Sequence, residues 1–154
     1  MYASRLLLLA ALLTCAGCTN QSQHNAEAVG DYFWNITSID GRSASALEAR
    51  TRLEFKDNHI YISGTCNNAA GNAVFTHQKL SISHLHSTLM ACDNEDLMSH
   101  EQYLTDWLAE ASSWSLSAAK SGAAPRLTLR QTSGSTIQLR GEPTPEKRYG
   151  SLPD

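Results

Sequence analysis

The sequence lacks the short motifs that carry the commonest enzyme chemistries. It holds no Gly-x-Ser-x-Gly nucleophile elbow, no His-Glu-x-x-His zinc helix and no glycine-rich loop that would cradle a phosphate. It also lacks a basic excess, because 12 Lys and Arg stand against 15 Asp and Glu. Non-specific nucleic-acid binding depends on clustered Lys and Arg, so this balance argues against a nucleic-acid partner. We therefore expect neither an enzyme nor a nucleic-acid-binding protein, and no cofactor.

No apolar run reaches the roughly 20 residues that a membrane-spanning helix needs. The one long apolar run, Leu6–Leu13, follows a short basic start and precedes the small pair Ala16-Gly17 and then Cys18. This order resembles the bacterial lipobox, in which a cysteine thiol is lipidated and a peptidase cuts just before it. The resemblance implies that residues 1–17 are a lipoprotein signal peptide and that Cys18 carries the lipid, palmitate included. The protein would then be held to a membrane by that lipid alone.

Two neighbours of Cys18 refine this interpretation. Cys15 stands where a lipobox usually has Leu, so a plain signal peptide cut nearby or an uncleaved anchor remains the alternative. Thr19, rather than Asp, follows Cys18. In a Gram-negative cell this resemblance implies sorting to the outer membrane, with the protein facing the periplasm.

Two cysteines, Cys66 and Cys92, remain for the body of the protein once Cys15 and Cys18 are assigned. An exported protein meets an oxidising compartment, which favours a disulfide between them. The bond would close a loop of about 26 residues, which is worth roughly 3 kcal/mol by chain entropy. A pair of buried free thiols is the alternative.

Polar segments at both ends bound a single domain. Residues 18–30 have almost nothing to bury and are expected to form a flexible tether. Residues 142–154 hold three of the four prolines among charged residues and are expected to form a disordered tail. The domain therefore covers residues 31–141, without internal repeats, and we expect it to be a monomer.

Within the domain, apolar residues alternate at period two in short segments that turn residues separate, as in antiparallel strands. A short helical turn is possible within residues 43–49. The expected strands are residues 32–39, 52–55, 59–64, 72–77, 79–85, 114–116, 125–130 and 136–140.

One segment departs from this pattern. From Glu95 onward, Leu97, Leu104, Leu108 and Ala111 recur at helical spacing, after a capping residue and early acids that suit a helix start. Strands and helices do not alternate along the sequence, so a parallel sheet is not expected. We expect an α+β fold that is mainly antiparallel β, with about eight short strands curled as an open barrel or paired sheets around one helix.

Two segments, Ile62–Gly71 and Leu80–Cys92, are too specific to be generic strands and turns. With Trp34-Asn35-Ile36 upstream and Glu101 downstream, they resemble the META (HslJ-like) domain family. Thr65 stands where relatives often have a second glycine. The positions that match the family pattern are Gly64, Cys66, Asn67, Gly71, Thr88, Met90, Ala91, Cys92 and Glu101. The resemblance implies a fold and an association with envelope stress such as heat or antibiotics, but no enzymatic activity.

The matched residues suggest structural roles. Gly64 and Gly71 would permit positive φ at sharp turns, and Asn67 would tolerate the same region or bond to its own backbone. Met90 and Ala91 suit the space beneath a helix.

The remaining matched polar residues are expected to shape turns. Glu101 would anchor a strand or turn through hydrogen bonds. Thr88 would help to form a turn, and the alternative is a functional hydroxyl at Thr88 or a functional amide at Asn67.

His84 and His86 are two residues apart, so a regular strand would present both imidazoles on one face, as metal ligands require. Leu80 and Ile82 share that parity whereas Leu85 takes the other, so we expect the inward face to switch near Ser83. A bulge there would turn both histidines towards solvent. We therefore expect no metal site.

Four aromatic residues could serve the core or a ligand. Phe33, Trp34, Trp107 and Trp114 are expected to fill the interior, and the alternative is a cavity like that of the cracked barrels in secretion pilot lipoproteins, which hold a lipid tail. The leading hypothesis is a non-enzymatic envelope lipoprotein that acts as a binding or stabilising module under stress. The runner-up is a carrier or pilot lipoprotein for a lipid or a secreted protein.

Overall fold

The computed structural model describes residues 26–117 and 123–145. Cys18, the signal peptide before it and the far end of the expected tail lie outside the described residues, so the lipidation site stays a prediction. None of the described helices is long and apolar enough to cross a membrane.

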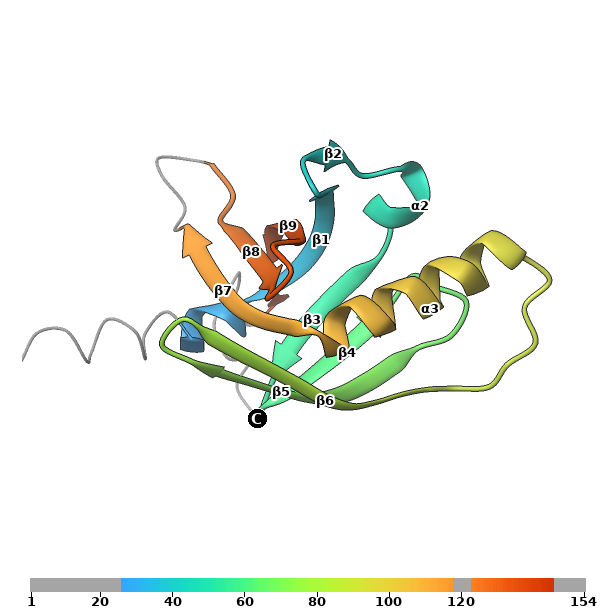
Figure 1. The fold of residues 1–154 in the computed structure, drawn as a ribbon, viewed down its shortest axis with the longest axis horizontal. Helices are drawn as coiled ribbons and strands as arrows, with labels where there is room; N and C mark the ends of the chain where they lie inside the picture. Colours follow the sequence, from blue (N-terminus) through green and yellow to red (C-terminus); the bar gives the residue numbers. More distant parts are fainter. Residues whose placement is uncertain (1–25, 118–122, 146–154) are drawn as a thin grey trace, which may run out of the picture.

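The chain folds into a closed antiparallel barrel (Figure 1). Every pairing between neighbouring strands is antiparallel, and β1 pairs with β9 to complete the ring. A two-residue strand, β2 (Arg42–Ser43), extends the edge of β1. The strands of the ring are β1 (Tyr32–Ile39), β3 (Arg52–Lys56), β4 (His59–Ser63), β5 (Ala69–Thr76), β6 (Lys79–Ser87), β7 (Ala111–Ser117), β8 (Arg126–Gln131) and β9 (Thr136–Pro143). The expected fold class, mainly antiparallel β with about eight strands and one helix, is confirmed, but the barrel is closed by the pairing of β1 with β9 rather than open.

The weakest seam of the ring lies between β6 and β7, which share a single residue pair, Lys79 with Ser113. The helix α3 (Glu95–Ala109) makes the connection between these two strands. It lies across the mouth of the barrel at which β4, β6 and β8 end, as its contacts with Thr51 and Ser135 show. The long connection therefore plugs one mouth of the barrel.

The opposite mouth is covered by residues 26–30, which lie just before β1. Val29 is fully buried there, and Trp34 Nε1 donates a hydrogen bond of 2.9 Å to the Val29 carbonyl oxygen. Residues 26–29 form a helical turn rather than part of a flexible tether. The chain thus enters the barrel at the end opposite to α3 (Figure 1).

Side chains at alternate positions along each strand point inward and fill the barrel. Leu53, Ile60, Leu127 and Leu139 are among those with no exposed surface, each in a strand whose neighbours along the chain face out. Burial of each such side chain contributes about 1.5–3 kcal/mol. The alternation seen in the sequence is therefore the cause of the sheet.

Three of the four aromatic residues considered above belong to this core. Trp34, Trp107 and Trp114 are all at most 5% exposed. Phe33 is different, because it lies on the outer face beneath the guanidinium of Arg52, 4.7 Å from its ring centre. The expectation that it fills the core is wrong, since it alternates with the buried Trp34 along β1.

The structure moves several element boundaries. β5 and β7 begin three residues before the expected starts, at Ala69 and Ala111, and α3 ends at Ala109. β9 continues through Pro143, which pairs with Tyr32, although the prolines placed this segment in a tail. The short helical turn is α2 (Ala46–Ala49).

Candidate functional site

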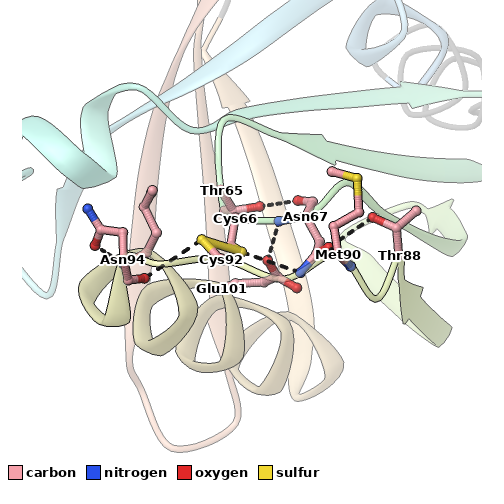
Figure 2. Close-up of a disulfide and its surroundings, with 9 residues drawn as sticks. Thr65, Cys66, Asn67, Thr88, Met90, Cys92, Asn94 and Glu101 are labelled. Carbon is pink, nitrogen blue, oxygen red and sulfur yellow. Dashed lines mark hydrogen bonds between the residues drawn. A yellow bond between two sulfur atoms is a disulfide. The ribbon is translucent and has the colours of Figure 1, made fainter.

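A disulfide joins Cys66 to Cys92 and connects two loops beside α3 (Figure 2). Cys66 lies in the turn between β4 and β5, and Cys92 lies in residues 88–94, here named the β6–α3 loop. The Cα atoms are 6.0 Å apart, within the usual range for a disulfide. The expected pairing is confirmed, and the alternative of two free thiols is not what the structure holds.

Asn67 fastens the start of the same loop. Its Oδ1 accepts hydrogen bonds from the Thr88 hydroxyl at 3.1 Å and from the Met90 backbone N–H at 2.8 Å (Figure 2). The Asn68 carbonyl accepts a further bond from the Thr88 N–H at 3.0 Å. Asn67 does not have positive φ. Its side-chain amide bonds to the neighbouring loop rather than to its own backbone.

Glu101 reaches from α3 to the same turn. Its Oε2 accepts a bond of 2.6 Å from the Asn67 backbone N–H, and its side chain is 9% exposed. A carboxylate accepting from a backbone amide makes a strong, charge-assisted bond. The expected anchoring role of Glu101 is confirmed.

The far end of the β6–α3 loop passes directly into the helix. Asn94 is the N-cap of α3, and its Oδ1 accepts from the Leu97 N–H at 3.0 Å. Glu95 and Asp96 occupy the first turn, where the helix dipole favours negative charge. The β6–α3 loop is therefore held by hydrogen bonds at Thr88 and Met90, by the disulfide at Cys92 and by the N-cap at Asn94.

The apolar side chains of this well-held loop nevertheless lie in solvent. Leu89 is 98% exposed, Met90 is 64% exposed, and Met98 on the first turns of α3 is 52% exposed. Ala91 is exposed as well. The expectation that Met90 and Ala91 fill the space beneath a helix is wrong. The fold uses the backbone N–H of Met90 and leaves its side chain outside.

The two glycines of the family pattern differ in their roles. Gly64 has φ +85°, and a Cβ there would overlap the Arg50 carbonyl. Gly71 does not have positive φ, contrary to expectation. It is required because a Cβ would lie 2.8 Å from the Ser83 carbonyl oxygen and 2.9 Å from Leu85 Cδ2. Close approach between β5 and β6 therefore excludes other residues at position 71.

The expected bulge near Ser83 is present in β6. Ala70 pairs with His86 and Asn72 pairs with Ser83, so two residues of β6 face the single Gly71. His84 has φ 54°, and both His84 and His86 are exposed. Within residues 26–117 and 123–145, no group of three or more His, Cys, Asp or Glu side chains could hold a metal ion.

A second polar cluster, which the sequence analysis missed, joins α3 to the segment between α2 and β3. His100 is 7% exposed, and its Nε2 lies 2.8 Å from the hydroxyl of the fully buried Thr51. Burial lowers the pKa of His100 and outweighs the opposing influence of Glu48. This contact depends on tertiary packing, so no local pattern indicates it.

The Glu48 carboxylate accepts two hydrogen bonds from the Arg42 guanidinium, at 2.7 and 3.0 Å. Together with Ser45 it forms a capping box at the start of α2. The Arg42 bonds lower the pKa of Glu48 to about 2. The Ser-x-x-Glu spacing is a local signal that could have indicated this cap.

A third contact ties the end of α3 to two turns of the barrel. Trp107 Nε1 donates to the Ser135 hydroxyl at 2.8 Å, and that hydroxyl donates to the Asp40 carboxylate at 2.9 Å. Asp40 also accepts from the Thr136 N–H at 2.7 Å, and this bond, followed by the Ser135 bond, lowers the pKa of Asp40. These groups are structural, since each is satisfied by its neighbours.

Comparison with known proteins gives a family and a fold. The model of the META domain family matches residues 27–144. A solved structure of a protein from Burkholderia xenovorans aligns with a TM-score of 0.60 at 16% identity, covering 92% of this chain and 97% of that chain. A second solved protein aligns with a TM-score of 0.52 at 19% identity, covering 73% and 92% respectively. Among curated proteins no match was found.

Proposed function

The chain belongs to the META domain family, and from this premise we propose that it is a non-enzymatic lipoprotein of the bacterial envelope that binds a protein partner through the β6–α3 loop. The lipid on Cys18 would hold it to the membrane. In a Gram-negative cell that membrane would be the outer one, and the barrel would stand in the periplasm as a monomer.

The observation that carries this proposal is an apolar surface on a preorganised loop. Leu89 and Met90 are exposed although a disulfide, the Asn67 amide and an N-cap hold their backbone. Exposed apolar side chains cost solubility, so a fold that fixes them in solvent favours an interaction role. A preorganised loop also loses little conformational entropy on binding, which raises affinity.

The position of the loop agrees with a role facing away from the membrane. Ala26, the first described residue, is eight residues after Cys18, so a fully extended tether reaches about 28 Å. That tether meets the mouth covered by residues 26–30, whereas the β6–α3 loop lies at the other end of the barrel (Figure 1). A partner in the periplasm would therefore meet the loop first.

A protein partner is favoured over a lipid cargo. A lipid carrier needs interior room, whereas Trp34, Trp107 and Trp114 are buried among the strands that would enclose it. A pilot that escorts a secreted protein would use the same exposed loop. It therefore differs from the main proposal in its partner and not in its site.

Complementation under stress tests the function. Loss of the gene should increase sensitivity to heat or to envelope-directed antibiotics, and the wild-type gene should restore tolerance. The double variant Leu89→Ser, Met90→Gln should fail to restore it at equal protein level. The matched control Val74→Ser, which removes a side chain that is 44% exposed on β5, should restore it fully. Full restoration by the loop variant would remove the loop from the proposal, and a deletion strain without any phenotype would remove the stress role.

The anchor is tested separately by mass spectrometry of the mature protein. The expected N-terminal residue is Cys18 carrying a diacylglyceryl thioether and an amide-linked acyl chain. An unmodified Cys18, or a mature chain that starts elsewhere, would contradict the lipoprotein assignment. Fractionation of the same cells then shows whether the lipoprotein lies in the outer membrane.

A further inference from the structure

Two arginines lie directly opposite each other on neighbouring strands of the barrel. Arg126 of β8 pairs with Arg140 of β9 in the antiparallel register. Leu127 and Leu139, the adjacent residues, are fully buried, so both arginine side chains leave the outer face. Directly opposed Cβ atoms are about 4.5–5.5 Å apart, and like charges in this position destabilise a sheet. The two guanidinium groups therefore repel each other, and an anion between them would relieve this repulsion.

The protein itself supplies no such anion within its described residues. Arg52, on the same outer face, has its Nη2 3.6 Å from the Glu142 carboxylate. In the part of the chain that the structure describes, no carboxylate lies within ion-pair distance of Arg126 or Arg140. Their two charges are left for solvent or for a ligand.

Both arginines line one hollow in the surface, with a volume of about 620 Å³. Thr37, Ser38 and Gln138 also line this hollow, and no Asp or Glu is among its lining residues. Hydroxyl and amide groups can complete the hydrogen bonds of an anion whose charge the two guanidinium groups neutralise. The hollow thus combines space, positive charge and neutral polar groups.

We propose that Arg126 and Arg140 form a binding site for the phosphate group of an anionic ligand. The guanidinium fork matches phosphate oxygens and makes paired, charge-assisted bonds with them. Two forks on adjacent strands, opposite each other in the register and lining one hollow, can share one phosphate, with Ser38 and Gln138 beside it. The site is separate from the β6–α3 loop, so it does not depend on the proposed function.

The phosphate can come from a phospholipid headgroup or from a soluble phosphate ester. Arg126 is the first residue of β8, so it lies towards the mouth of the barrel that residues 26–30 cover. A lipid on Cys18 would bring this end within about 28 Å of the bilayer surface. The experiment therefore needs a soluble arm and a membrane arm.

In the soluble arm, inorganic phosphate is titrated into the lipoprotein in an uncharged maltoside detergent at physiological salt. NMR follows the side-chain Nε–H signals of the arginines and the backbone N–H signals of residues that line the hollow, so that the backbone signals report binding in the arginine variant as well. The signals of Arg126 and Arg140 should shift saturably. In the double variant Arg126→Gln, Arg140→Gln, binding should weaken by roughly ten-fold or more, the effect expected for losing charge-assisted bonds.

The matched control is Arg50→Gln, Arg130→Gln, which removes the same charge from two exposed arginines outside the hollow. It should keep the affinity for phosphate within about two-fold, because screening weakens long-range charge effects at this salt concentration. The membrane arm compares nanodiscs of phosphatidylcholine with nanodiscs containing about one third phosphatidylglycerol, whose charge lies at the bilayer surface.

Each outcome decides the proposal. Saturable shifts at Arg126 and Arg140 with inorganic phosphate, with phosphatidylglycerol or with both support it, and the arm that responds identifies the source of the phosphate. The proposal is overturned if neither arm shifts these signals. It is also overturned if the control variant loses as much affinity as the Arg126, Arg140 variant, because net charge alone would then explain the binding.

Discussion

At the scale of single residues, Asn67 does the most to position the β6–α3 loop. Its Oδ1 accepts from both Thr88 and Met90, its Nδ2 lies 3.5 Å from Cys66 Sγ, and its backbone N–H donates to Glu101. One side chain thus connects the turn after β4 to the loop after β6, while the backbone connects the same turn to α3. An apolar residue at position 67 would keep only the backbone bond.

The variant Asn67→Ala should lower the free energy of unfolding by about 1–2 kcal/mol, since two hydrogen bonds to loop donors are lost. Urea denaturation measures that change. Hydrogen exchange at the Met90 amide should become faster, because its acceptor is gone. Asn68→Ala is the matched control, as that side chain is exposed, and it should change stability by less than about 0.5 kcal/mol. Equal effects of the two variants would show that the Asn67 amide does not organise the loop.

His100 makes a pH-dependent contribution to stability. Its pKa is lowered by burial, so in the folded protein it stays neutral at pH values where the unfolded chain, with a pKa of about 6.5, is already protonated. The unfolded state then binds more protons, and the free energy of unfolding falls as pH drops below about 6.5. The groups that face His100 are Thr51 and the more distant Glu48. Glu48, whose pKa is lowered to about 2, adds a second loss of stability between pH 4.5 and about 2.

The variant His100→Gln can keep a hydrogen bond to Thr51 but cannot be protonated. Its free energy of unfolding should therefore change little between pH 6.5 and 5, whereas that of the wild type falls. Urea denaturation at several pH values measures both. His59→Gln makes the same change at an exposed position and should retain the slope of the wild type. A wild-type slope in His100→Gln would show that another group is responsible.

At the scale of elements, the barrel depends on two kinds of glycine. Gly64 and Gly134 both have positive φ, at +85° and +95°. A Cβ at Gly134 would meet nothing within 4 Å, whereas a Cβ at Gly64 would overlap the Arg50 carbonyl and lie 3.2 Å from Thr51 Cα. The backbone strain is therefore similar at the two turns, and only Gly64 adds a steric clash.

Gly134→Ala should lower the free energy of unfolding by about 1–2 kcal/mol, because an L-residue in left-handed backbone conformation is destabilised by that amount. Gly64→Ala should lower the free energy of unfolding by at least about 2 kcal/mol more, because the added methyl group would also press against rigid backbone. Thermal and urea denaturation of the two variants give the difference directly. Equal costs would indicate that the turn between α2 and β3 moves aside to accept the methyl group.

The same elements show what could be predicted from sequence. β1 was predicted with the correct bounds, since one face of Tyr32–Ile39 alternates into the core. The start of α3 was predicted because Asn94 and the acids after it are local signals. The exposure of Met90 was not predictable, because a sequence motif does not tell whether the side chain or the backbone of a residue is used. Gly71 was misinterpreted for a similar reason, as its constraint comes from Ser83 across the sheet.

At the scale of the whole molecule, the barrel separates three structural features along its length. Residues 26–30 cover one mouth, and the β6–α3 loop stands at the other mouth beside α3 (Figure 1). The arginine pair lies on the flank towards the first mouth. The helix α3 connects the two strands of the weakest seam, so the loop that leads into it bears on ring closure as well as on the proposed binding. Fixing this loop therefore serves the stability of the whole molecule.

The disulfide provides the test at this scale. Cys66 and Cys92 are 26 residues apart, and removing the bond by Cys66→Ser, Cys92→Ser should lower the free energy of unfolding by roughly 3 kcal/mol. Urea denaturation with and without dithiothreitol measures it. The reductant should destabilise the wild type to the level of the variant and leave the variant unchanged, because the variant has no bond between these loops to reduce. If the reductant changes neither protein, the disulfide is absent in solution. The β6–α3 loop would then depend on Asn67, Glu101 and Asn94 alone, and its apolar side chains would be less preorganised for a partner.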